Sequence, residues 1–420
     1  MFVTTLPAAA PMVVRTIEVG DPGPLLKLLP EDGAPMAWIR RGEGVVGWGE
    51  AARFDTVGAN RFGAADRWWR RMVATAVVRD EVRLPGTGPV AFGSFAFEDV
   101  PGESSLVLPE MVVGHRAGRW WVTTVSVSGN LPGLPDLPAV SAPRRPHDIT
   151  YSDGTRSGAE WETIVAEAVR RITAGDLEKV VLARDLIAEG ADPIDRRWPV
   201  QRLAERYPRC WTFSVDGLIG ATPELLVRRE RGLVTSRILA GTIRRTGDDA
   251  RDLALAASLA RSSKDLEEHE YAVRSVAEAL TPFCSSMNVP ETPFVLHLPN
   301  VMHLATDLAG VTDDAASSLA LAAALHPSAA VGGTPTDAAR ELIREIEGLD
   351  RARYAGPVGW MDGEGDGEWG IALRCAELDP HNPARLRLFA GCGIVAGSDP
   401  AAELAESAAK LVPMRDALSV

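Results

Sequence analysis

Lys179 lies in the segment 178–184, Glu-Lys-Val-Val-Leu-Ala-Arg, whose composition predicts a β-strand. Strand alternation places Lys179 on the same face as Val181 and Ala183. Desolvation on an apolar face would disfavour the ammonium form, so the amine could serve as a general base. The alternative is a lysine on an edge strand, where the side chain reaches solvent and discourages aggregation.

Glu224 is a second residue whose position could support chemistry. It follows Thr222 and Pro223 and opens the apolar run 225–227, so it begins a strand directly after a turn. Such a position can bury the carboxyl group, raise its pKa and allow it to donate a proton. The alternative is a carboxylate at a strand end in contact with water.

Two pairs of acidic residues have a spacing that brings their side chains to one face of a helix. They are Asp265 with Glu268, and Glu403 with Glu406. If both pairs converged on one pocket, they would form an oxygen-rich site suited to Mg²⁺, which binds one or two carboxylates and keeps several waters. Two solvated helix faces are the alternative, because acidic helices are common.

Glycines gather in three loops, at 240–242, 330–335 and 389–394. Such loops allow the backbone to approach an anion closely or to turn tightly. None has the spacing of a P-loop, and Gly391 with Gly393 lacks the third glycine of a dinucleotide-binding fingerprint. His303 has no partner at a metal-ligand spacing, so a core or capping histidine is the alternative to a functional one.

The elements that must position these residues mix strands and helices. Residues 1–130 contain short β-like runs, and 131–146 carries five prolines, which predicts a boundary between parts 1–145 and 146–420. In the second part we expect one long helix over 248–280 and a strand over 368–375. Because there is no regular βαβ alternation, the fold class expected is α+β, built on antiparallel sheets.

Composition excludes several classes of protein. The 420 residues include 44 Lys+Arg and 57 Asp+Glu, a formal net charge of −13, which argues against a general nucleic-acid binder. The four cysteines have neither zinc-ligand spacing nor the pattern of a disulfide framework. With no secretory leader and no membrane span expected in the sequence, we predict a cytoplasmic protein.

Together, several segments resemble the chorismate-utilising enzymes, a family that includes isochorismate, salicylate, anthranilate and aminodeoxychorismate synthases. The matching segments occur in the family's order between about residues 155 and 415: 179–184 (KVVLAR), 221–226 (ATPELL), 240–242 (AGT), 263–269 (SKDLEEH), 300–303 (NVMH), 326–333 (HPSAAVGG), 354–360 (YAGPVGW), 367–374 (GEWGIALR), 389–395 (FAGCGIV) and 403–410 (ELAESAAK). The resemblance implies large antiparallel β-sheets in a sandwich flanked by helices. It also implies that 146–420 is the chorismate-binding catalytic region and that 1–145 is a variable part packed on the same fold.

The resemblance assigns roles to the candidate residues. Lys179 matches the base that activates water for attack at C2 of chorismate, and Glu224 matches the acid that protonates the departing C4 hydroxyl. Glu268 and Glu406 match the family's Mg²⁺ ligands, with Asp265 and Glu403 as nearby partners. The positions that match the substrate pocket are Gly241, Thr242, His303, Ala330, Tyr354, Arg374, Gly391, Gly393 and Lys410.

Two positions distinguish among members of the family. Enzymes that make aminodeoxychorismate usually carry a nucleophilic lysine where this chain has Ala240, so water is the nucleophile expected here. Salicylate synthases of the mycobacterial type tend to have threonine at the position of Ala330, which favours an isochorismate synthase that feeds menaquinone or siderophore synthesis. A salicylate synthase and a non-catalytic chorismate-binding protein remain the alternatives. We expect chorismate as the small-molecule partner, no glutaminase subunit, and a monomer.

Overall fold

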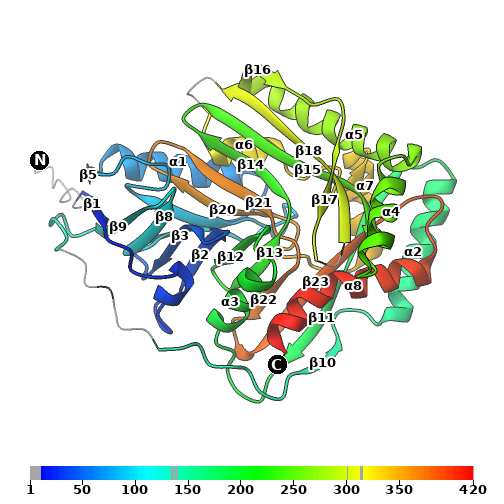
Figure 1. The fold of residues 1–420 in the computed structure, drawn as a ribbon, viewed down its shortest axis with the longest axis horizontal. Helices are drawn as coiled ribbons and strands as arrows, with labels where there is room; N and C mark the ends of the chain where they lie inside the picture. The colour runs from blue at the N-terminus through cyan, green and yellow to red at the C-terminus, as the bar shows by residue number, and fades with distance from the viewer. Residues whose placement is uncertain (1–10, 134–136, 138–140, 300, 313–315, 420) are drawn as a thin grey trace, which may run out of the picture.

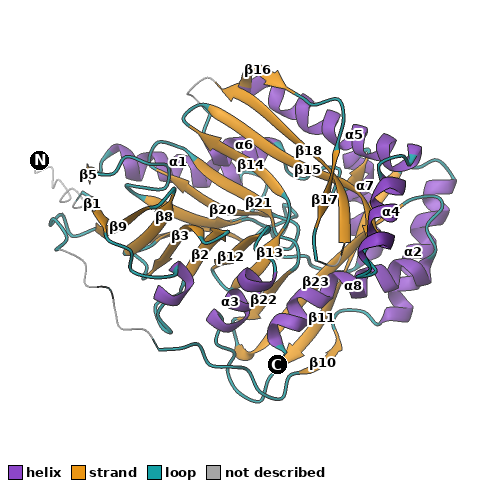
Figure 2. Ribbon diagram, viewed as in Figure 1, coloured by secondary structure: helices purple, strands orange, loops and turns teal. Residues whose placement is uncertain are grey.

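The computed structural model describes residues 11–133, 137, 141–299, 301–312 and 316–419 (Figure 1). These residues form two large β-sheets flanked by helices, which confirms the predicted α+β class (Figure 2). Within this part of the chain, none of the helices combines the length and apolar character needed to cross a membrane.

The larger sheet has 13 strands in the order β10-β11-β23-β22-β13-β12-β2-β3-β8-β9-β1-β5, with β19 pairing on β11. All neighbours are antiparallel except β1 and β5. The strands are β1 (Val13–Val19), β2 (Met36–Arg40), β3 (Glu43–Trp48), β5 (Val77–Asp80), β8 (Met111–Arg116), β9 (Arg119–Ser126), β10 (Thr150–Asp153), β11 (Lys179–Glu189), β12 (Trp211–Val215), β13 (Leu218–Thr222), β19 (Gly333–Thr334), β22 (Cys375–Asp379) and β23 (Asn382–Ile394).

The smaller sheet has ten strands in the order β16-β18-β15-β14-β21-β20-β6-β7-β4, with β17 pairing on β18. They are β4 (Ala52–Thr56), β6 (Val90–Ser94), β7 (Ser104–Leu108), β14 (Leu225–Glu230), β15 (Leu233–Arg244), β16 (Cys284–Asn288), β17 (Phe294–His297), β18 (Val301–Thr312), β20 (Pro357–Asp362) and β21 (Gly367–Ile371). Both sheets include strands from either side of the boundary predicted at 145–146, since β12 pairs with β2 and β20 pairs with β6.

Helices α2, α4, α5, α7 and α8 gather on the right in Figure 1, beside the strands β11 and β23. The helices are α1 (Arg61–Ala74), α2 (Gly158–Thr173), α3 (Arg197–Arg206), α4 (Asp249–Leu259), α5 (Ser263–Leu280), α6 (Ser318–Ala324), α7 (Thr336–Leu342) and α8 (Pro400–Leu418), with the short turns η1 (Leu25–Leu28), η2 (Thr281–Phe283) and η3 (Ile343–Glu347). Ser157 and Glu160 form a capping box at the start of α2, and the Asp399 side chain caps α8.

One hydrophobic core joins the inner faces of the two sheets. Trp38 and Phe213 come from the larger sheet, Phe92 and Trp369 from the smaller, and all four are 2% exposed or less. Full burial of a side chain such as Phe contributes roughly 1.5–3 kcal/mol of transfer free energy, so the packing of sheet on sheet stabilises the fold. The result is a rigid frame from which the functional side chains project.

Two predicted elements are wrong in extent. The helix expected over 248–280 is divided into α4 and α5, because Ser262 takes an extended conformation and its side chain caps the Asp265 N–H. The strand expected over 368–375 is divided between the sheets, since β21 ends at Ile371 and β22 begins at Cys375 in the other sheet. Arg374, at this crossing, has a φ of 50°.

Candidate active site

Lys179 is the first residue of β11, next to the C-terminal end of β23. Its side chain is only 16% exposed and forms an ion pair with Glu268 of α5. Backbone pairing on both sides, to Thr334 of β19 and through Val180 to Ile394 of β23, places this end of β11 inside the sheet. Lys179 is therefore not a lysine on a solvated edge, the alternative considered from the sequence.

Two glycines of β23 make room for candidate site side chains. A Cβ atom at Gly393 would lie 2.8 Å from Cε of Lys179, and one at Gly391 would lie 2.9 Å from the Tyr354 hydroxyl oxygen. Any larger residue at either position would displace the side chain opposite it. These two glycines therefore set where Lys179 and Tyr354 can lie.

Glu224 lies between β13 and β14, at the point where the chain passes from the larger sheet to the smaller. Its backbone carbonyl accepts from the Ile371 N–H at 3.3 Å, and the residue is 6% exposed. Burial raises the pKa of the Glu224 carboxyl to about 8, although the positive charges of Arg374 and Lys179 oppose this shift. At neutral pH the group is therefore mostly protonated and can donate a proton.

The predicted pocket residues surround one cavity of about 100 Å³. Nine of them line it: Glu224, Thr242, His303, Ala330, Tyr354, Arg374, Gly391, Gly393 and Lys410. A second hollow, of about 250 Å³, is lined by Lys179 and Glu268 and shares Ala330 with the first. Ala330 thus lies between the hollow lined by Lys179, the candidate base, and the cavity lined by Glu224, the candidate acid.

Gly241, Asp265, Glu403 and Glu406 are not among the described residues that line these two hollows. Gly241 forms a bulge in β15, where its φ is 76° and the register with β18 shifts. A Cβ atom there would lie 3.2 Å from Cβ of Asp265, so the bulge lets α5 approach β15 closely. Gly241 and Asp265 therefore position neighbours of the cavity.

His303 of β18 and Thr242 of β15 form a polar pair in the cavity wall. Nδ1 of the histidine lies 2.9 Å from the threonine hydroxyl oxygen, and Nε2 is buried with no hydrogen-bond partner among the described residues. Burial, together with the charges of Arg374 and Lys410, lowers the pKa of His303 to about 3. The ring is thus neutral. Asn300, which begins the matching segment before His303, lies outside the described residues.

Basic groups give the cavity a local positive charge in this acidic protein. Arg374 and Lys410 line it, and Nζ of Lys410 donates to the Gly391 carbonyl at 2.9 Å. The same ammonium lies 2.7 Å from a carboxylate oxygen of Glu406. The ring of Tyr354 stacks on Phe389, and burial raises the pKa of the Tyr354 hydroxyl, which stays protonated. The cavity can therefore hold a small anion.

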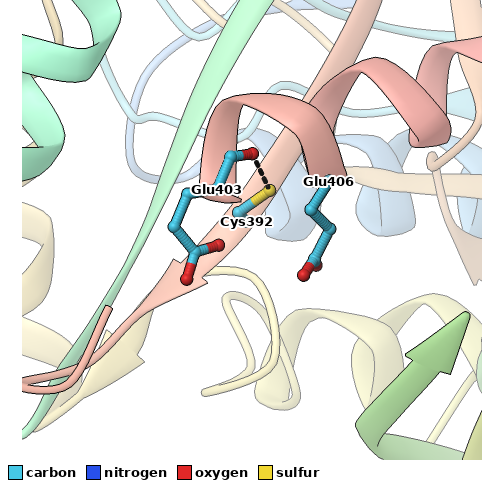
Figure 3. A group of neighbouring side chains, drawn as sticks. All are labelled: Cys392, Glu403 and Glu406. Carbon is cyan, nitrogen blue, oxygen red and sulfur yellow. Dashed lines mark hydrogen bonds between the residues drawn. The ribbon is translucent and has the colours of Figure 1, made fainter. Parts of the chain in front are cut away.

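The four candidate metal ligands lie on two helices, Asp265 and Glu268 on α5 and Glu403 and Glu406 on α8. Within the described residues, ligand atoms of Glu403, Glu406 and Cys392 all lie within 4.8 Å of one another. Figure 3 shows both carboxylates pointing the same way from the first turns of α8, with the Cys392 sulfur directed to the Glu403 carbonyl.

The charges around Glu268 and Glu406 fit a hard divalent cation. Burial alone would raise the pKa of Glu406, but Lys410 and Arg374 leave it lowered, so Glu406 is ionised. Glu268 and Glu406 each form an ion pair with one lysine. A metal cation can replace either lysine as the counter-ion. Burial raises the pKa of the Cys392 thiol to about 12, so this soft donor stays protonated. Carboxylate oxygens remain, which are the ligands Mg²⁺ prefers.

The sequence analysis did not identify one charged residue that lines the cavity. Arg351 lines the cavity and is paired with Glu347, and both side chains are 1% exposed. The signal available was a Glu and an Arg at i,i+4 shortly before Tyr354, a spacing that is also common on solvated helices. Only the fold distinguishes this buried pair from a surface pair.

Comparisons with known proteins show what the chain as a whole is similar to. A family model described as chorismate binding enzyme matches residues 13–131 and 135–419. The isochorismate synthase DhbC of Bacillus subtilis is 42% identical over 273 residues, 62% of this chain and 68% of that protein. The salicylate biosynthesis isochorismate synthase of Pseudomonas aeruginosa is 35% identical over 401 residues, covering 89% and 82%. The crystal structure of DhbC from Bacillus anthracis has a TM-score of 0.76 at 33% identity, covering 94% of this chain and 98% of that chain.

Proposed function

The chain belongs to the family of chorismate binding enzymes, and we propose that it converts chorismate to isochorismate in the described cavity with the aid of Mg²⁺. It is an isochorismate synthase, hence an isomerase, like relatives that are 42% and 35% identical to it. The observation that carries the residue assignment is the buried Glu224, whose pKa of about 8 makes it a proton donor in a cavity also lined by Arg374 and Lys410.

In the proposed mechanism a water molecule attacks C2 of chorismate, the ring double bonds shift, and the C4 hydroxyl departs as water. Lys179, as the proposed base, takes a proton from the attacking water, and Glu224 gives a proton to the leaving hydroxyl. One water enters and one leaves, so the reaction is an isomerisation. Proton exchange with solvent then returns Lys179 to the amine and Glu224 to the acid.

Other side chains of the cavity hold the substrate. Arg374 and Lys410 supply positive charge for the two carboxylates of chorismate, and the hydroxyl of Tyr354 supplies a hydrogen-bond donor. Glu268 and Glu406, with Asp265 and Glu403 nearby, are the residues proposed to bind Mg²⁺. When bound, the ion would neutralise the ring carboxylate of chorismate.

Product analysis tests the proposed function directly. Purified protein incubated with chorismate and Mg²⁺ should give isochorismate in equilibrium with chorismate, as separated by chromatography. Addition of an isochorismatase should then consume all the chorismate. Salicylate with pyruvate would indicate a salicylate synthase and would show that Ala330 does not discriminate. Absence of any turnover would favour a protein that only binds chorismate.

A second prediction concerns the metal site. The substitution Glu406→Gln keeps the size of the side chain but removes the charge, so Mg²⁺-dependent turnover should fall by at least tenfold at subsaturating Mg²⁺. Binding of Mn²⁺ as a paramagnetic substitute, measured without chorismate, should weaken in parallel. Asp249→Asn, on the exposed start of α4, is a matched control that should change neither quantity. Full activity of the wild type in a chelator would exclude the site.

We further propose that the protein is a monomer, that it needs no glutaminase subunit and that it acts in the cytoplasm. Mass measurement in solution checks the first point, and turnover by the purified chain without ammonia checks the second.

A further inference from the structure

Glu347 and Arg351 form a buried ion pair beside the candidate active site. Nε of the arginine donates to Oε1 of Glu347 at 2.7 Å, and Nη2 donates to Oε2 at 2.6 Å. Each side chain is 1% exposed, and the guanidinium lies 4.3 Å from the ring centre of Phe97. The geometry is bidentate, which is the strongest form of such a pair.

The same ion pair forms hydrogen bonds to backbone groups of β11 that a neighbouring strand would otherwise bond. Strand β19 pairs only with Lys179 and Val180, so the groups that follow on this side of β11 need other partners. The Val181 carbonyl accepts from Nη2 of Arg351 at 2.6 Å, and the Ala183 N–H donates to Oε2 of Glu347 at 2.7 Å. The pair is thus bonded directly to the strand that begins with Lys179.

Arg351 also reaches the segment that separates the two hollows. Its Nη1 donates to the carbonyl of Val331 at 3.1 Å, and Gly332 is bonded to Val181 at 2.9 Å through the backbone. Val331 directly follows Ala330, which lines both hollows. With these bonds, four of the five N–H donors of the guanidinium are engaged. One guanidinium therefore links the base-bearing strand to the wall at Ala330.

Stability alone does not explain a pair of this kind. Buried ion pairs lose so much hydration that well-packed apolar residues of similar volume often give equal or greater stability. Apolar side chains could not, however, bond to Val181, Ala183 and Val331 at the same time. The bonds to the two segments are what an apolar pair would lack.

We propose that Glu347 and Arg351 are positioning residues for the reaction, which hold the strand of Lys179 and the Ala330 segment at a fixed separation. This inference rests on the proposed function of the cavity. Displacement of a catalytic group by about 1 Å can lower a rate roughly 100-fold, so a small relaxation of either segment should be visible in kcat.

The test is the double variant Glu347→Met/Arg351→Met, which removes both charges together and leaves no unpaired buried ion. We expect it to fold, with kcat for isochorismate formation at least tenfold lower and KM for chorismate changed by less than about threefold. Arg351→Lys, which keeps the charge and can keep one carbonyl contact, should recover part of kcat. If Arg351 instead bound substrate, KM would rise and kcat would be spared, and that result would overturn the proposal.

A matched control is the buried ion pair of Asp195 and Arg197. Neither residue is one of the described residues that line the cavity. Asp195→Leu/Arg197→Met should shift the melting temperature while leaving kcat unchanged. Wild-type kcat in the double variant of Glu347 and Arg351 would show that the pair is only structural.

Crystal structures of the wild type and of the double variant test the positioning role independently of the proposed function. If the wild type makes no isochorismate, the proposed function fails, but the displacement of Ala330 relative to Val181 in the double variant still decides the positioning role. An unchanged separation in that crystal structure would overturn it.

Discussion

Glu224→Gln is expected to lower kcat for isochorismate formation by about 10²- to 10⁴-fold, the range that a single positioned proton donor contributes. Glutamine has nearly the same shape and can still donate an N–H hydrogen bond, but it cannot transfer a proton to the leaving hydroxyl. Chorismate binding, followed by fluorescence of the protein's tryptophans, should stay within a few-fold of the wild type. An unchanged kcat would remove Glu224 from the mechanism.

The pH dependence of the same variant follows from the pKa of about 8 at Glu224. The wild type needs the protonated acid, so kcat/KM should decline as pH rises through about 8. The variant, which lacks this group, should lose that limb. The stability of the wild-type fold also falls as pH rises, for the same reason. A carboxyl group whose pKa is higher in the folded state destabilises the fold increasingly as pH rises from about 4.5 to about 8. Glu224→Gln should therefore melt at a higher temperature than the wild type at pH 8.

The sequence predicts the type of fold and the place of two candidate site residues on strands, because both depend on local signals. Alternation in 178–184 places Lys179 on a strand, and the run after Thr222-Pro223 places Glu224 at the start of another. Both positions agree with the structure, in β11 and directly before β14. The local sequence cannot determine that Lys179 is enclosed, since that depends on β19 and β23, which lie far away along the chain.

Long-range contacts also explain what the sequence does not predict. The apolar spacing over 368–375 indicates one strand, but Arg374 turns the chain from one sheet into the other at a φ of 50°. This turn places the arginine in the cavity. Similarly, the glutamate and arginine before Tyr354 have the spacing of a surface pair, and only packing against β11 buries them. Residues that act through tertiary contacts therefore lack a local signature.

Replacement of Lys179 is expected to have two opposite effects, the first of them large, because the residue is both the proposed base and the partner of a proposed metal ligand. In the structure its ammonium is the counter-ion of Glu268, yet the proposed reaction needs the amine as a base. Lys179→Met removes the base and leaves a side chain of similar length. We expect kcat to fall by about 10²- to 10⁴-fold.

The same substitution should strengthen metal binding. With Lys179 replaced, Glu268 loses the counter-ion that the described side chains provide. The affinity for Mg²⁺, measured by calorimetry or by displacement of Mn²⁺, should therefore rise a few-fold, as expected for the loss of a competing ion pair worth about 1 kcal/mol. Lys27→Met, far along the chain in η1, is the control and should alter neither quantity. A Lys179→Met protein that binds Mg²⁺ more weakly would show that the lysine supports the metal site instead of competing with it. Retained turnover would mean that another group activates the water.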